Sequence, residues 1–214
     1  DGRVLVASEE QHSDLFWGVR GGGGNFGIVT RYHFRLDPTG LILAGLIGLP
    51  MTAEAVRGYV DAATAAPEEL STQLIIAPAP PAPFVPADKV GTPVALVVAC
   101  WSGDHEAGRD VLGRFSALAG GSLFELVDVM PYSALFEFLR EPTRPGGYGA
   151  TRSSFLRNVE DGLIDAVLAE VPPASSLVQF RVLGGAMTRV PTDATAFAHR
   201  DKPYMLLLAG VAPD

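Results

Sequence analysis

Four consecutive glycines, followed by Asn, Phe and a fifth glycine, restrict the fold of this chain more than any other feature (Gly21 to Gly27). Glycine has no Cβ, so its backbone can adopt positive φ angles and its amides can approach an anion closely. The run therefore predicts a turn built for close contact. A flexible linker is the alternative, but Phe26 and the regular pattern after it argue against that interpretation.

The glycine spacing matches two nucleotide-binding patterns, and the context excludes both. A dinucleotide-binding fold needs a strand before the glycines and a helix after them. Here a short helix is expected at 15–20, before the glycines, and a strand at 28–36, after them. His199-Arg200-Asp201 imitates a kinase catalytic triplet, but the accompanying lysine, asparagine and Asp-Phe-Gly motif are missing from the sequence.

Periodic apolar residues predict helices alternating with strands. Residues 28–36 alternate between apolar and polar side chains, which predicts a half-buried strand. Further strands are expected at 41–49, 72–77, 94–101, 122–128, 177–183 and 204–211. Apolar residues at helical spacing predict helices around 56–63, 112–119, 132–139 and 163–171.

Two segments are too rich in proline or glycine for regular structure. Residues 78–93 hold six prolines and predict an extended surface connection, either a long hairpin loop or an interaction segment. Residues 141–148 predict a second long loop. The break at 37–40 is the best domain boundary and separates a small N-terminal piece from the body of the chain.

Composition excludes several classes of partner. The 214 residues carry 16 basic and 24 acidic side chains, so the formal charge of −8 provides no basic field for nucleic acid or anionic lipid. The longest uncharged apolar stretch, 41–51, is shorter than the ~20 residues that a membrane span needs. The single cysteine, Cys100, excludes an internal disulfide and is expected to be a small buried residue. The histidine spacings offer no metal pair. We expect a soluble protein, cytoplasmic rather than secreted, that binds no nucleic acid, membrane or metal.

The run SDLFWGVRGGGGNFGIVT, from Ser13 to Thr30, closely resembles a segment of the berberine bridge enzyme-like FAD-linked oxidases, within the vanillyl-alcohol oxidase (PCMH-type FAD-binding) superfamily. Shorter pieces resemble the same family in the same order: 99–103, 130–132, 183–186 and 197–201. The resemblance implies an FAD domain interrupted by a substrate domain that roofs the flavin. It implies an α+β fold in which helices cover one face of an antiparallel sheet, with a short remnant of the FAD-binding domain.

The resemblance also divides the chain. Residues 1–40 correspond to the end of the first FAD-binding segment, and residues 41–214 to a substrate-binding domain that is incomplete at its C-terminus. The start at Asp1 without a methionine agrees with a fragment. The family's flavin-tethering histidine and C-terminal segment have no counterpart in this sequence, so no catalytic residue is assigned. FAD is expected in the intact parent and is not expected to be retained by this chain.

Candidate ligand contacts come from the resemblance and from strand alternation. Carried over residue by residue, the resemblance implies FAD contacts at Gly23, Gly24, Asn25, Gly27, Ile28 and Val29. On strand 177–183, Val178, Phe180 and Val182 are expected beneath the helices, which leaves Gln179 and Arg181 to face the substrate. Polar side chains that simply face solvent are an alternative of equal weight.

The resemblance implies that the parent oxidises a small organic substrate by hydride transfer to flavin, with dioxygen as acceptor. Alcohols, sugars, amines and secondary metabolites all stay open as substrates. The alternative is that the isolated chain is a non-catalytic small-molecule-binding or scaffold domain. A yellow purified protein would favour the first hypothesis, and a colourless one the second. The apolar face of 28–36 also predicts self-association through the N-terminal segment.

Overall fold

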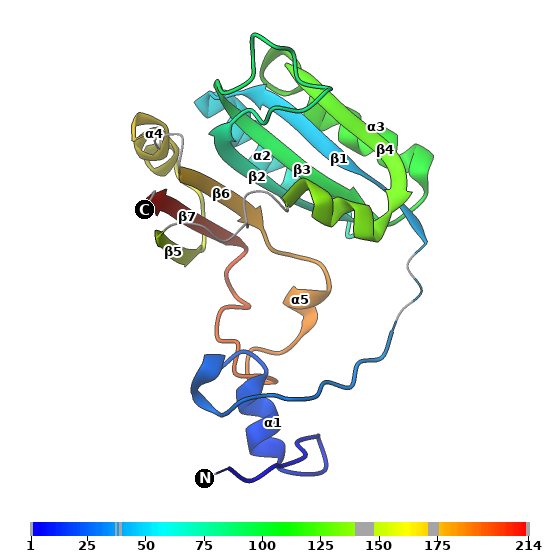
Figure 1. The fold of residues 1–214 in the computed structure, drawn as a ribbon, viewed down its shortest axis with the longest axis vertical. Coiled ribbons are helices and arrows are strands. Elements are labelled where there is room, and N and C mark those ends of the chain that lie inside the picture. Colours follow the sequence, from blue (N-terminus) through cyan, green and yellow to red (C-terminus); the bar gives the residue numbers. More distant parts are fainter. Residues whose placement is uncertain (1, 37, 39, 140–147, 171–175, 213–214) are drawn as a thin grey trace.

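A computed structural model describes residues 2–36, 38, 40–139, 148–170 and 176–212 of this chain. Its centre is a seven-stranded sheet in the order β4-β1-β3-β2-β6-β7-β5, in which every neighbouring pair is antiparallel (Figure 1). The strands are β1 Leu41–Pro50, β2 Leu70–Pro78, β3 Pro93–Trp101, β4 Phe124–Pro131, β5 Tyr148–Leu156, β6 Ser176–Val182 and β7 Tyr204–Ala212. The α-helices are α1 Ser13–Val19, α2 Ala53–Thr64, α3 His105–Ser116, α4 Asp161–Ala169 and α5 Ala186–Arg189, and the 3-10 helices are η1 Gly23–Asn25, η2 Leu118–Gly120 and η3 Tyr132–Leu139. The predicted α+β fold with an antiparallel sheet is confirmed.

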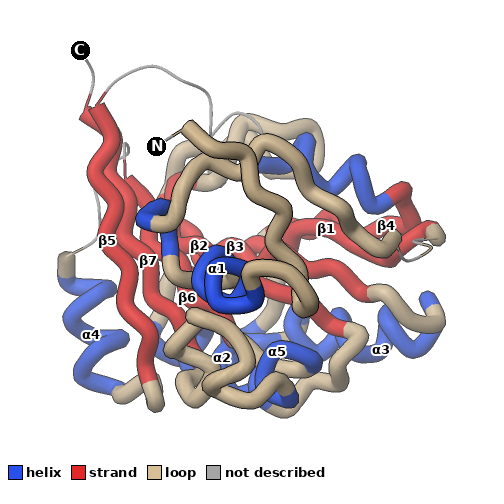
Figure 2. Tube along the Cα trace, turned by 90° about the horizontal axis from the view of Figure 1, so that it is seen from below, coloured by secondary structure: helices blue, strands red, loops and turns tan. Residues whose placement is uncertain are grey.

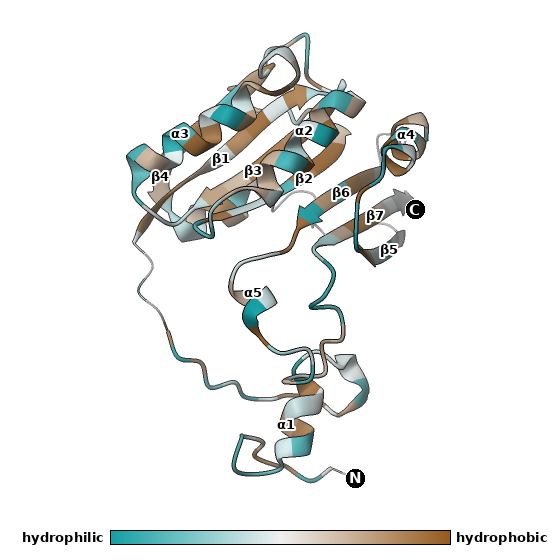
Figure 3. Ribbon diagram, turned by 180° about the vertical axis from the view of Figure 1, so that it is seen from behind, coloured by the Kyte–Doolittle hydropathy of each residue, from teal (hydrophilic) through white to brown (hydrophobic). Residues whose placement is uncertain are grey.

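Helices α2, α3 and α4 lie on one side of the sheet (Figure 2). Strand alternation explains this arrangement, because Leu74 and Ile76 of β2 are buried with the helices, whereas Ile75 is buried on the opposite face. Figure 3 shows apolar strands and polar outer surfaces on α2 and α3, as expected for helices that bury one stripe. The prediction of helices on one face is therefore confirmed.

Side-chain caps begin the two long helices. Thr52 and Asp104 each accept hydrogen bonds from backbone amides in the first turn of α2 and α3, respectively. Helix α2 then buries Tyr59 completely against the sheet, where its hydroxyl donates to the carbonyl of Phe180 at 3.4 Å. Burial raises the pKa of Tyr59 above its ordinary value, so this phenol stays protonated beneath the sheet.

The proline-rich segment is a hairpin connection between β2 and β3. Pro78 pairs with Pro93 at its base, and Ala79 and Val85 are buried against Leu96 in a second apolar cluster on the face opposite the helices. The prediction of a long hairpin loop is confirmed. The loop also contributes to the core, because its apolar side chains cover one part of that face.

The strand predicted at 28–36 is wrong. The structure shows coil there, with side chains that are exposed throughout the segment. Alternation gives a strand two faces, but the backbone groups also need a neighbouring strand, and none in the described part of the chain pairs with these residues. The extended segment instead runs beside the molecule from the glycine-rich turn towards β1 (Figure 1).

Other differences concern element type and number. The helix predicted at 132–139 is the 3-10 helix η3, while β5 and α5 were not predicted at all. Strand β5 has the sequence YGATRSSFL, whose small and polar residues give a weak strand signal. Most of the loop predicted at 141–148 lies outside the described residues, as do Asp37 and Thr39 of the predicted boundary. No helix in the described ranges is long and apolar enough to cross a membrane.

Candidate functional site

The glycine-rich turn has a packed side and an open side. Gly21 has a φ of +117°, and a Cβ built on it would lie 2.6 Å from the Cβ of Phe197, so only glycine fits there. Gly24 and Gly27 differ, because a Cβ added to either would meet no atom within 4 Å. The packed side fixes the position of the turn, and the open side leaves its backbone accessible.

The open side fits the contacts expected with FAD. The residues implied by the resemblance are all exposed: Gly23, Gly24, Asn25, Gly27, Ile28 and Val29. Gly23 and Gly27 have φ angles of +77° and +143°, which favour glycine, and the missing side chains let a phosphate or a planar ring approach the backbone. The Asn25 amide adds a hydrogen-bond donor. These residues could hold one edge of the cofactor, and their contact with FAD stays a prediction.

Helix α1 anchors the turn to the connection between β6 and β7. The indole Nε1 of Trp17 donates to the carbonyl of Asp193 at 2.6 Å, and the carbonyl of Trp17 accepts from the amide of Ala196 at 3.3 Å. Arg20 Nη2 donates to the carbonyl of Ala194 at 3.5 Å. The N-terminal segment and a connection near the end of the chain are therefore held side by side.

Gln179 and Arg181 lie on the sheet face opposite the helices. Val178 and Phe180 alternate with them along β6; they are 2% and 3% exposed and pack beneath the helices. The predicted orientation of β6 is therefore confirmed. Arg181 donates from Nε and Nη2 to Oε1 of Gln179 at 3.2 and 2.7 Å. The pair is half-buried, and its arrangement leaves the Gln179 amide nitrogen as a donor for a ligand. Its role in substrate binding stays a prediction.

One row of side chains crosses this face of the sheet, opposite the helices, which we call the open face. Gln73 of β2 is opposite Arg181, Arg181 is opposite Met205 of β7, and Met205 is opposite Phe155 of β5. Directly opposed residues share a face of an antiparallel sheet, and neighbouring strands lie about 4.8 Å apart, so Phe155 lies about 10 Å from Arg181 on the same face.

The connection between β6 and β7 returns to this row at Phe155. His199 stacks on Phe155 with ring centroids 4.5 Å apart and 21° between the planes. Phe197 meets the Phe155 and His199 rings edge-on, with centroids at 5.5 and 5.9 Å. The segment that contacts α1 and the glycine-rich turn therefore also contacts the row that contains Arg181.

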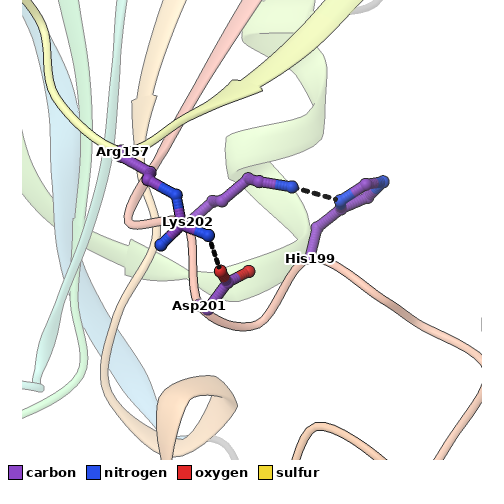
Figure 4. Close-up of polar contacts among 4 residues, drawn as sticks. All are labelled: Arg157, His199, Asp201 and Lys202. Carbon is purple, nitrogen blue, oxygen red and sulfur yellow. Dashed lines mark hydrogen bonds and ion pairs between the residues drawn. The ribbon is translucent and has the colours of Figure 1, made fainter.

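One polar contact lies within the same connection, and another joins it to the residue that follows β5 (Figure 4). Lys202 Nζ donates to Nδ1 of His199 at 3.0 Å, and Arg157, just beyond β5, pairs with Asp201 at 2.6 Å. An ammonium group can only donate, so Nδ1 of His199 is the acceptor in this contact, which leaves Nε2 as the N–H donor of the ring. The Gln179–Arg181 pair on β6 adds further N–H donors at this end of the sheet. Such donors suit a ligand whose oxygen atoms accept hydrogen bonds.

Sequence reasoning missed this connection. Neither the histidine spacing nor the kinase-like triplet at 199–201 indicates a contact with β5. In the described ranges no group of three or more His, Cys, Asp or Glu is placed to hold a metal ion. The resemblance of residues 197–201 to the oxidase family was the one available signal. Cys100, expected to be buried, is only half-buried, and its partial burial raises the pKa of its thiol.

A separate cavity of about 550 Å³ lies between α4 and the strands β5, β6 and β7. Leu163 and Val167 of α4 line it together with Val178 and Leu206, which also pack with the helices. The cavity is therefore on the helix side of the sheet and is distinct from the face that carries Gln179 and Arg181.

Solved structures of other proteins share the fold of this chain. BBE-like 1 of Physcomitrella patens superposes with a TM-score of 0.80 at 16% identity, and a carbohydrate oxidase from Microdochium nivale, solved with a substrate analogue, with 0.77 at 20%. Each comparison covers 100% of this chain and 48% of the other. An FAD-linked oxidoreductase of Dictyostelium discoideum is 22% identical over 222 residues, which cover all of this chain and 46% of that protein. No family model matches the chain.

The sequence comparison and the fold comparison indicate the same class of protein. The chain spans about half the length of the curated relatives it matches over its full length. Over its full length the chain is similar in sequence to part of an FAD-linked oxidoreductase, and its fold is similar to that of a berberine bridge enzyme-like protein, in agreement with the resemblance of residues 13–30.

Proposed function

We propose that this chain supplies the substrate-binding domain, residues 41–214, and the end of the first FAD-binding segment, residues 1–40, of an FAD-dependent oxidase that acts on a small organic molecule. The observation that carries the proposal is the double contact of the β6–β7 connection. Its residues 193–197 hold α1 and the glycine-rich turn, and His199 stacks on the open face of the sheet. A cofactor on the turn and a substrate on the sheet would then meet at one end of the strands.

Each group of residues has a distinct task in this proposal. The open side of the turn, at Gly23, Gly24 and Gly27, would hold one edge of FAD. The Gln179–Arg181 pair would orient the substrate through its amide and guanidinium donors. When bound, FAD would supply the redox chemistry by accepting a hydride from the substrate, with dioxygen as the final acceptor.

The donors on the open face favour a substrate rich in oxygen. Hydroxyl, carbonyl and carboxylate groups all accept hydrogen bonds from amides, guanidinium groups and an imidazole N–H. A structural neighbour is a carbohydrate oxidase solved with a substrate analogue, which supports testing sugars and simple alcohols first. The same neighbour, named an oxidase, supports dioxygen as the acceptor.

The proposal is tested on the longer protein that contains this chain, loaded with FAD. Sugars and alcohols are added without oxygen while the flavin absorbance is followed, and air is then admitted while hydrogen peroxide is measured. We expect bleaching by at least one substrate, recovery in air and peroxide formation. A folded longer protein that binds no flavin, or whose flavin none of these compounds bleaches, would contradict the proposal.

The matched control separates substrate binding from folding. Gln179→Ala should slow the bleaching, whereas Arg189→Ala should not, because Arg189 is exposed and pairs with Glu68 rather than with the Gln179–Arg181 pair. Equal slowing by both variants would argue against a substrate role for the open face.

A further inference from the structure

We propose that Arg200 is a positioning residue: through Thr195 and Phe197, it sets the place of the glycine-rich turn relative to the Gln179–Arg181 face. Its effect on flavin and turnover rests on the function proposed above. The placement itself is a property of this chain and can be measured without a cofactor.

The contacts of Arg200 converge on the segment that holds α1. Its Nη2 donates to Oγ1 of Thr195 at 2.8 Å, and its Nη1 donates to the carbonyl of Met187 at 3.2 Å. The guanidinium carbon lies 5.4 Å from the centroid of the Phe197 ring. Thr195 is a buried polar residue, and its hydroxyl also accepts from the amide of Phe197 at 3.4 Å. Arg200 thus braces residues 195–197 from within.

The residues on either side of Arg200 are fastened to the sheet. His199 stacks on Phe155 of β5, and Asp201 pairs with Arg157 just beyond the same strand. The backbone at 199–201 is therefore held at the edge of the sheet, while the Arg200 side chain reaches towards Thr195. Movement of the braced segment relative to the sheet would require breaking the contacts of Arg200.

The braced segment in turn holds the N-terminal region. Phe197 packs against Gly21, where any side chain would collide, and residues 193, 194 and 196 hydrogen-bond Trp17 and Arg20. The open glycines begin two residues after Gly21. A continuous path of direct contacts therefore leads from β5, through Arg200 and residues 195–197, to the proposed FAD contacts.

The geometry calls for arginine rather than another cation. Two nitrogens of one planar group reach two separate acceptors, Thr195 and Met187, while the guanidinium carbon lies over an aromatic ring. Lysine has a single ammonium group and cannot reproduce this planar fork. In the described part of the chain the Nε of Arg200 is buried without a hydrogen-bond partner, so this part of the side chain is shielded from solvent.

Trp17 provides a direct probe. It is 43% exposed and its carbonyl accepts a hydrogen bond from Ala196 of the braced segment, whereas Trp101 is buried in the core. In the 214-residue chain without cofactor, we expect Arg200→Ala to release α1, so that the acrylamide quenching constant of Trp17 rises about twofold as its ring becomes fully exposed. Trp17→Phe, alone and combined with Arg200→Ala, assigns the signal to Trp17.

Three further variants test the explanation. Arg200→Lys should restore only part of the protection of Trp17, and Thr195→Val, which removes the acceptor hydroxyl at nearly constant volume, should raise quenching in the same direction as Arg200→Ala. Arg189→Ala removes an exposed cation of the same connection and should leave quenching unchanged. If Arg200→Ala fails to fold, Thr195→Val carries the test.

Folded variants at Arg200 and Thr195 that leave Trp17 quenching at the wild-type value would overturn the proposal. The flavin readout is made separately in the longer protein, where Arg200→Ala should shift the visible absorbance of bound FAD and reduce kcat more than it changes KM. If Trp17 is released while flavin and turnover are unaffected, the brace has no positioning role in the reaction and this inference is wrong. If the wild-type longer protein binds no flavin, the proposed function has failed, and the Trp17 result still decides whether the brace exists.

Discussion

Arg181 directs two of its guanidinium nitrogens to one oxygen of Gln179, at 2.7 and 3.2 Å, across two positions of the same strand. Because successive side chains on a strand alternate between faces, residues two positions apart stand next to each other on one face. The bonds fix the amide orientation of Gln179 so that its nitrogen is available to a ligand. A pair arranged in this way presents an oriented donor before any ligand arrives.

Replacing either member of this pair should affect the reaction more than the fold. Gln179→Ala and Arg181→Ala each remove a half-buried side chain that the helices do not cover, so we expect a change in the free energy of unfolding below about 1 kcal/mol. In the longer flavoprotein, turnover or substrate affinity should fall. Steady-state kinetics and thermal melts test both expectations, and unfolding of the polar variants would show that their surroundings are misassigned.

Phe180→Ala should have the opposite effect. Phe180 is 3% exposed, and its removal leaves a cavity beneath the helices that should lower the free energy of unfolding by about 3–5 kcal/mol. Urea unfolding of the 214-residue chain measures this value. A Phe180→Ala variant that unfolds at the wild-type urea concentration would mean that the two faces of β6 are exchanged.

The two sides of the glycine-rich turn should respond differently to the same substitution. Gly21→Ala creates a Cβ that would lie 2.6 Å from Phe197 at a positive φ, so it should detach α1 and increase hydrogen exchange in residues 13–20. Gly24→Ala meets open space and should leave exchange unchanged, while weakening FAD binding in the longer protein. Equal exchange in both variants would remove the distinction between the packed and open sides.

The sequence predicted the sheet better than the site, and the reason is physical. Strands such as β3 are apolar enough to be recognised alone, because they are buried on both faces. Whether a segment forms a strand at all depends on partners, which is why 28–36 was overpredicted and the polar edge strand β5 was missed.

The brace at Arg200 depends on contacts between distant positions. No local pattern indicates that Trp17 will bond to Asp193, or that His199 will stack on Phe155. The orientation of Gln179 was predictable because alternation along a single strand determines it. Contacts within one element could thus be inferred from the sequence, whereas contacts between elements required the fold.

This chain alone should bind FAD weakly. The glycine-rich turn offers one open edge, and the cofactor is a long molecule that needs contacts along its full length for tight binding. Titration of the 214-residue chain with FAD, followed by flavin fluorescence, should show no saturable submicromolar site. A stoichiometric site in this titration would mean that the residues present here form most of the cradle.

The extended segment after the turn should drive self-association of the isolated chain. Ile28, Phe34 and Leu36 are 92%, 76% and 86% exposed, and Tyr32 stacks on Phe34 with centroids 5.5 Å apart, so several apolar side chains face solvent together. Apolar surface of this kind is removed from water when two chains meet. We expect light scattering to give a mass above that of the monomer, and this mass should rise with concentration.

The double variant Ile28→Ser, Phe34→Ser should return the chain to a monomer, whereas His33→Ser, an exposed polar position of the same segment, should not. A wild-type chain that stays monomeric at every concentration would show that these side chains are tolerated in water as they stand.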